Sequence, residues 1–267
     1  MTGINQAAER AKIERRIAAP LPYSIRQPYI WIGIQGNIKV NLGSILMREI
    51  CLFPLSTVLF PGMPLPLHIF EPRYQVMIQR CLEDDRPFGV VLIRQGLEAL
   101  GPLAEPYSVG CTANIVQVER LEHGRMNILA LGEERFRIHD MHQEQPYLTG
   151  TVEVMPMDIP HTLSVVRAAQ GLIPWVKAYL RLLATLGDKE LDLGPGPVDL
   201  PEDALMLTYM AASLLQVPTE EKQTLLESET AAHLMHKVSR LYRRELAILN
   251  SLREISPERA NLAAWLN

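Results

Sequence analysis

The chain has 267 residues, of which 48% are hydrophobic and 21% are charged, and its formal net charge is −4. This composition lies close to the average of soluble globular proteins and excludes collagen-like, low-complexity and wholly disordered chains. The acidic balance excludes nucleic-acid binding that relies on bulk positive charge, although it leaves a local basic patch open. A chain of this length forms one large domain or two small ones.

The charge is distributed unevenly along the chain. Residues 1–46 carry six Lys or Arg against two acids, a net of +4, whereas residues 47–267 carry 20 against 28, a net of −8. We therefore expect a basic N-terminal extension over 1–46 and a folded body that starts near Met47. Three interpretations of the extension stay open: a basic anchoring arm, a disordered tail, or sequence upstream of a natural start at Met47.

The three cysteines, Cys51, Cys81 and Cys111, are an odd number and include no C-x-x-C pair. They form neither a disulfide framework nor a four-cysteine zinc site, and we expect buried core thiols in a reducing compartment. The first 20 residues lack the apolar core of a secretory signal, and no run reaches the ~18 apolar residues of a membrane span. The sequence thus predicts a cytoplasmic protein with no membrane partner.

Strands dominate the prediction from Met47 to about Pro156. Short apolar runs separated by Pro and Gly predict β-strands, and their spacing suggests a closed or partly closed sheet. One helix interrupts the strands, with Pro72 at its start and apolar residues at helical spacing as far as Leu82.

A hairpin is predicted in the middle of this region. The turn falls at His123-Gly124, and Gly132 is expected to form a bulge farther along the return strand. Alternation along that strand points three apolar side chains inward: Met126, Ile128 and Ala130.

From about Thr162 the apolar period becomes helical. A break is expected at Gly171 and Pro174, and an irregular loop at 192–201. Thr219 begins an N-cap signature. The expected helices make a small bundle and cover 162–186, 202–216, a short segment from 219, and 229–252.

The last expected helix carries three arginines, Arg240, Arg243 and Arg244. They could contact nucleic acid, but the neighbouring acids Glu227 and Glu245 favour a charged, solvated face of the bundle.

Sequence motifs for catalysis are missing. There is no G-x-x-x-x-G-K-[ST] phosphate loop, no G-x-G-x-x-G after a strand and no G-x-S-x-G nucleophile elbow. The pairs His139 with His142 and His233 with His236 offer too few ligands for a metal. We therefore expect no catalytic residue, metal or cofactor, with an enzyme whose site is assembled only in three dimensions as an open alternative.

The most informative segment is residues 52–82, LFPLSTVLFPGMPLPLHIFEPRYQVMIQRCL. Its prolines lack the backbone N–H groups that would donate hydrogen bonds to a neighbouring strand. The segment therefore predicts an edge strand, a tight crossing at Pro61-Gly62, a second strand and a helix. The segment resembles the first motif of the Lon protease N-terminal domain. This substrate-binding domain is found at the N-terminus of Lon and as a free-standing bacterial protein. The resemblance covers about 50–252 and continues through 88–93, 109–138, 147–154 and 225–249.

The resemblance implies an α+β fold, with a PUA-like β pseudobarrel over 47–158 and a C-terminal helical bundle over 159–267, together one Lon N-terminal domain. It implies a non-catalytic protein-binding module in protein quality control or as an adaptor, because the ATPase and Ser-Lys peptidase modules of Lon have no counterpart in this sequence. The partners it implies are unfolded or degron-bearing proteins and an ATP-dependent protease, with nucleic acid not expected.

Six residues of the resembling motif are candidates for protein contacts, because interfaces favour aromatic, Met and Arg side chains. Three lie at the crossing and three at the strand-to-helix corner: Phe60, Pro61 and Met63, then Phe70, Arg73 and Tyr74. The competing interpretation is core packing for the aromatics and a structural ion pair for Arg73. The alternative function is an RNA-binding PUA-like protein, which the net charge of −8 over 47–267 opposes.

Overall fold

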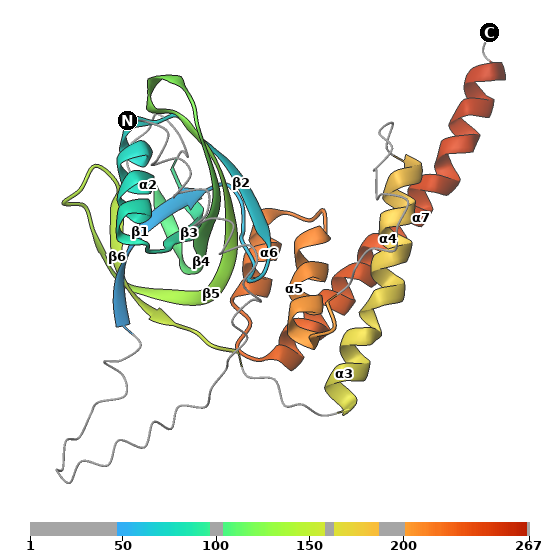
Figure 1. Ribbon diagram of the computed structural model, residues 1–267. Helices are drawn as coiled ribbons and strands as arrows, with labels where there is room; N and C mark the ends of the chain where they lie inside the picture. The colour runs from blue at the N-terminus through green and yellow to red at the C-terminus, as the bar shows by residue number, and fades with distance from the viewer. Residues whose placement is uncertain (1–46, 97–103, 158–162, 187–200, 266–267) are drawn as a thin grey trace.

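The computed structural model describes residues 47–96, 104–157, 163–186 and 201–265 (Figure 1). The basic extension predicted over 1–46 and most of the loop predicted at 192–201 lie outside these residues.

Six strands of the described residues form one sheet that closes on itself. The strand order is β2-β5-β4-β3-β1-β6, and β6 also pairs with β5, which closes a ring of five strands with β2 alongside. Among these described strands, only β1 and β3 pair in parallel. This confirms the predicted closure. The strands are β1 (Met47–Leu55), β2 (Pro64–Ile69), β3 (Phe88–Gln95), β4 (Glu105–Arg120), β5 (Met126–His142) and β6 (Leu148–Val154).

Two apolar clusters occupy opposite faces of these strands. Along β1, Ile50 and Leu52 belong to one cluster, whereas Phe53 and Leu55 belong to the other, as the two-residue period of a strand requires. The first cluster draws side chains from β1, β3, β5 and β6, so it fills the inside of the ring. The space there is narrow: a Cβ on Gly110 would lie 2.6 Å from Cζ of Phe136.

Helix α2 (Pro72–Asp84) covers the second cluster. It begins at Pro72 as predicted, and its buried face consists of Tyr74, Met77, Ile78 and Cys81. These side chains pack with residues of β1 to β5, including Met126, Ile128 and Ala130, which are buried as predicted but on the face that α2 covers rather than inside the ring. The predicted turn is also confirmed, since His123 and Gly124 both adopt positive φ angles.

The predicted bulge in β5 lies directly after Gly132. Ala113 pairs with Gly132 but Cys111 pairs with Arg135, so β5 has one more residue than β4 in this interval. The backbone of Gly132 also bonds to the crossing, donating to the Met63 carbonyl at 3.0 Å and accepting from Gly62 N–H at 2.8 Å. A Cβ on Gly132 would lie 2.3 Å from the Phe60 carbonyl oxygen, which explains why glycine stands there.

In the described part of the chain after the sheet, five helices follow: α3 (Leu163–Gln170), α4 (Leu172–Leu186), α5 (Ala204–Leu214), α6 (Thr219–Leu226) and α7 (Ala231–Trp265). The chain breaks at Gly171 as predicted, whereas Pro174 lies within the first turn of α4, where a missing N–H is tolerated. Thr219 is the first residue of α6 rather than its cap, which is Pro218. The side chain of Asp203 caps α5 by accepting from the N–H groups of Leu205 and Met206. The PUA-like classification stays a prediction.

The sheet and the helices meet at a buried arginine. Figure 1 shows α6 beside the closed sheet, with α7 leading away from it. Arg135 on β5 is 3% exposed, and its Nη1 donates at 2.7 Å to the carbonyls of Leu226 and Ser228, at the C-terminal end of α6. Its Nη2 donates at 3.3 Å to the Met155 carbonyl, and Gln223 of α6 donates in turn to the Val109 carbonyl of β4 at 3.0 Å.

We expect Arg135→Ala to lower the free energy of unfolding by about 3 kcal/mol, because hydrogen bonds from a charged donor are strong and their carbonyl acceptors stay buried. Urea denaturation measures the change. Arg137→Ala is the matched control, since Arg137 lies two residues along the same strand and is exposed; its loss should stay within about 0.5 kcal/mol. Equal losses for the two variants would contradict the structural role of Arg135.

Candidate functional site

The six predicted contact residues lie at two places in the structure and differ in how exposed they are. Phe60 is fully buried and packs on Tyr209 of α5, with ring centroids 6.1 Å apart. Pro61 is buried and Met63 is half-buried, so the crossing contributes to packing between the sheet and the helices. At the other corner Tyr74 is buried, Arg73 is half-buried, and Phe70 is 49% exposed.

The exposed Phe70 borders an apolar groove, which we call the Phe70 groove. Its volume is about 150 Å³, and it lies where β1, β2 and the start of α2 meet. The rings of Phe70 and His68 stack at the rim, 6.0 Å apart with an angle of 21° between their planes. The lining residues are Phe53, Leu55, Pro66, Leu67, His68, Ile69, Phe70, Glu71 and Tyr74.

Polar contacts fix the corner that carries Phe70. Glu71 caps α2 with its carbonyl, which accepts from the N–H groups of Tyr74 and Gln75 at 3.0 Å. The Gln75 side chain donates to the Phe70 carbonyl at 3.1 Å. The Glu71 carboxylate accepts from Arg73 Nε at 2.9 Å, and the guanidinium lies 4.6 Å from the centroid of the Tyr74 ring. The first turn of α2 therefore fixes the position of the residues at this corner of the groove.

Among the described strands, β2 pairs on one side only, with β5, and prolines restrict its other edge. The Met63 carbonyl bonds to Gly132 of β5, so alternate residues from Met63 onward direct their backbone polar groups toward β5. Pro64 and Pro66 consequently face the unpaired edge, where they supply no N–H donor. An extended chain could not form a regular ladder there, so recognition at this corner falls to side chains.

A second groove, which no sequence pattern predicted, lies between α3, α4 and α7. Its volume is about 760 Å³. Trp175 is 37% exposed, and the Arg243 guanidinium lies 5.7 Å from the centroid of its ring. Trp175 is the residue that could have indicated this groove from the sequence, but its position opposite α7 depends on the tertiary fold. The lining residues are Val165, Ala168, Gly171, Trp175, Ala232, Met235, His236, Ser239, Arg240 and Arg243.

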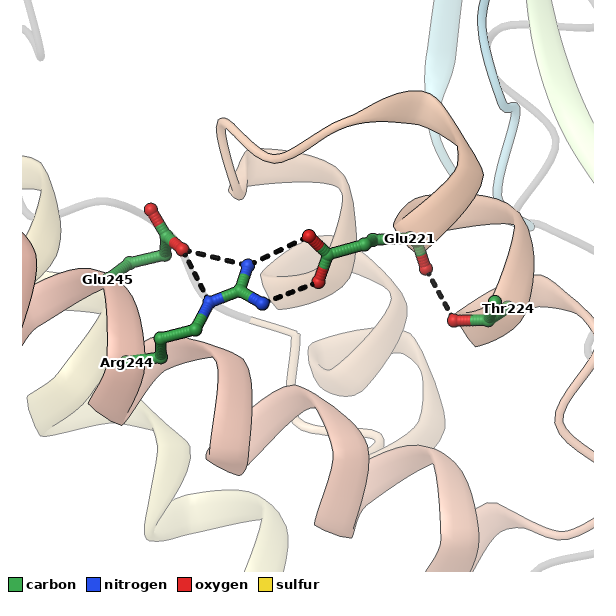
Figure 2. A network of polar contacts seen from close by, with 4 residues as sticks. All are labelled: Glu221, Thr224, Arg244 and Glu245. Atoms are coloured by element: carbon green, nitrogen blue, oxygen red, sulfur yellow. Dashed lines mark hydrogen bonds and ion pairs between the residues drawn. The ribbon is translucent and has the colours of Figure 1, made fainter.

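The arginine cluster of α7 makes intramolecular contacts. Arg244 forms a bidentate ion pair with Glu221 of α6, at 2.8 and 3.0 Å, and also donates to Glu245 at 2.9 Å (Figure 2). Arg243 stacks on Trp175. These partners support the predicted charged face, because the two arginines already have counterions or ring partners within the chain.

In the parts of the chain that the structure describes, no three His, Cys, Asp or Glu side chains gather in a metal-binding cluster, and His139 instead lies 2.8 Å from Glu153. None of the described helices has the length and apolar character needed to cross a membrane.

Comparison with known proteins gives one consistent result. The family model of the ATP-dependent protease La (LON) substrate-binding domain matches residues 49–244. Lon protease 1 of Hydrogenovibrio crunogenus is 24% identical over 222 residues, which are 83% of this chain and 26% of that protein. Lon protease of Syntrophus aciditrophicus is 27% identical over 206 residues, which are 72% of this chain and 24% of that protein. The chain thus spans about a quarter of the length of these curated relatives.

Two solved structures share the fold. The Lon N-terminal domain protein from Xanthomonas campestris has a TM-score of 0.50 and 20% identity, covering 72% of this chain and 98% of that one. The N-terminal domain of Mycobacterium avium complex Lon protease has a TM-score of 0.51 and 18% identity, covering 73% and 98%.

We expect Arg73→Ala to destabilise the protein by about 2 kcal/mol, because it removes the partner of a largely buried carboxylate. The side chains of Arg73 and Glu71 are 17% and 11% exposed. Arg48→Ala is the matched control: Arg48 and Glu134 are also 2.9 Å apart, but with 38% and 53% exposure, so solvent screening should limit the loss to about 0.5 kcal/mol. Urea denaturation compares the two, and a larger loss for Arg48→Ala would refute the distinction.

Proposed function

The chain belongs to the family of LON substrate-binding domains, and from this premise we propose that it is a non-catalytic module that binds unfolded or degron-bearing proteins. The observation that carries the proposal is the Phe70 groove, an apolar groove bordered by an exposed aromatic on a fixed corner. Aromatic anchors in pockets are the usual source of binding energy in protein interfaces.

The groove supports recognition of single apolar side chains in an extended client. Its volume of about 150 Å³ suits one large side chain, and the prolines of β2 disfavour a continuous added strand. We infer that Phe70 and Arg73 contact the client directly, that Tyr74 forms part of the groove wall, and that Phe60, Pro61 and Met63 contribute by packing the crossing against the helices.

We further propose that the module acts in protein quality control or as an adaptor, in the cytoplasm, and delivers clients to an ATP-dependent protease. The relatives named Lon protease support the choice of partner. We propose that 47–158 and 159–267 act as one binding unit, because Arg135 on β5 donates two hydrogen bonds to the carbonyls of Leu226 and Ser228 at the end of α6.

Replacing Phe70 by Ala should weaken client binding about tenfold, the usual effect of losing a central aromatic anchor. Fluorescence anisotropy with labelled, reduced and carboxymethylated α-lactalbumin as a permanently unfolded probe measures the dissociation constant. Ile248→Ala is the matched control, since Ile248 is a comparably exposed apolar residue on α7; it should leave binding unchanged.

Two outcomes would overturn the proposal. Wild-type protein that fails to bind the unfolded probe contradicts the function, and equal weakening by both variants contradicts the Phe70 groove. Titration with a labelled single-stranded RNA at increasing salt tests the alternative, because RNA binding that is tight and falls steeply with salt would replace protein binding as the function.

A further inference from the structure

Two of the three cysteines meet between β1 and α2, in a cavity distinct from the Phe70 groove. Cys51 of β1 and Cys81 of α2, thirty residues apart in the chain, line the same cavity of about 450 Å³. Cys51 is half-buried, whereas Cys81 is buried in the cluster beneath α2. Both thiols are free, and the neighbouring Cys81 side chain is the largest influence on the pKa of Cys51.

The surroundings favour a thiolate at one of the two sulfurs. The hydrogen bond from Cys81 is the largest of the effects that lower the pKa of Cys51 to about 7, and the Tyr147 hydroxyl and the Arg80 guanidinium add to it against the opposing effect of burial. Arg80 Nη1 lies 3.4 Å from the Tyr147 hydroxyl, so these groups form one cluster. The same hydrogen bond and burial raise the pKa of Cys81, which stays a thiol.

We propose that Cys51 is a modification site for hydroperoxides, with Cys81 as the second thiol that closes a reversible intrachain disulfide. The Cys51 thiolate attacks one peroxide oxygen, the O–O bond breaks, and the departing alkoxide or hydroxide takes a proton from solvent. The product is a sulfenic acid at Cys51.

Cys81 then attacks the Cys51 sulfur. The S–S bond forms, the S–O bond breaks, and the Cys81 proton leaves with the hydroxyl as water. Two electrons pass from the thiols to the peroxide, and a dithiol reductant returns the disulfide to the two thiols by exchange, becoming a disulfide itself. A redox role for Cys51 and Cys81 goes beyond the expectation that all three cysteines are inert core residues. That expectation still describes Cys111, which is fully buried and whose pKa is raised by burial.

The test uses the full reduced chain, treated with hydrogen peroxide at neutral pH, blocked with an alkylating reagent, digested without reduction and mapped by mass spectrometry. We expect a peptide joined through Cys51 and Cys81 that dithiothreitol releases, with Cys111 unmodified. Cys51 should react at least about tenfold faster than Cys111, because a thiol with a pKa near 7 holds roughly tenfold more thiolate than an ordinary cysteine.

Variants separate the two steps. Cys81→Ser should trap a sulfenic acid at Cys51 that dimedone labels, Cys51→Ser should abolish the cross-link, and Cys111→Ser should leave it intact. Circular dichroism checks the fold of each variant. Equal reactivity of Cys51 and Cys111 in the wild-type chain, or cross-links only between chains, would overturn the proposal.

Discussion

The buried guanidinium of Arg135 is the interaction on which the assembly of sheet and helices depends. Burial is the main cause that lowers its pKa, yet an arginine starts so high that it stays charged, and the charge must be satisfied where it lies. The carbonyl oxygens at the end of α6 do this, because the last turn of a helix has unpaired acceptors and a partial negative charge. Arginine reaches two of these acceptors through Nη1 and the Met155 carbonyl through Nη2, so its donors are spread over two nitrogens, whereas a lysine has all its donors on one.

The bulge after Gly132 links this junction to the candidate site. The extra residue changes the register just before Arg135, and bulges commonly re-aim the side chains that follow them. On its other side, Gly132 bonds to the backbone of Met63 and Gly62 at the start of β2. The same few residues therefore position both the guanidinium that holds α6 and the strand that leads to Phe70. The junction thus holds the strand that leads to the groove, and a fixed groove would lower the entropic cost of the client binding proposed above.

Sequence periodicity predicted most of the elements but few of the contacts between them. The closed sheet, the start of α2 at Pro72, the turn at His123-Gly124 and the bulge follow from local rules of strands, prolines and glycines. Alternation does not reveal which face meets a second layer, and so Phe60 and Tyr74 could not be separated from the exposed Phe70. The pairing of Arg135 with α6 spans about ninety residues, and only the folded chain brings such partners together.

The thiol pair and the Phe70 groove lie at opposite ends of the contact between β1 and α2. Cys51, Phe53 and Leu55 alternate along β1 on the face that meets α2, and Tyr74 and Cys81 lie on the buried face of that helix. Tyr74 borders the groove, and seven residues of helix place Cys81 about 10 Å farther along the axis. A covalent bond at the Cys81 end would restrain α2 against β1 without occupying the groove. Oxidation would therefore act on the rigidity of the groove wall rather than on its chemistry, because every lining side chain remains the same.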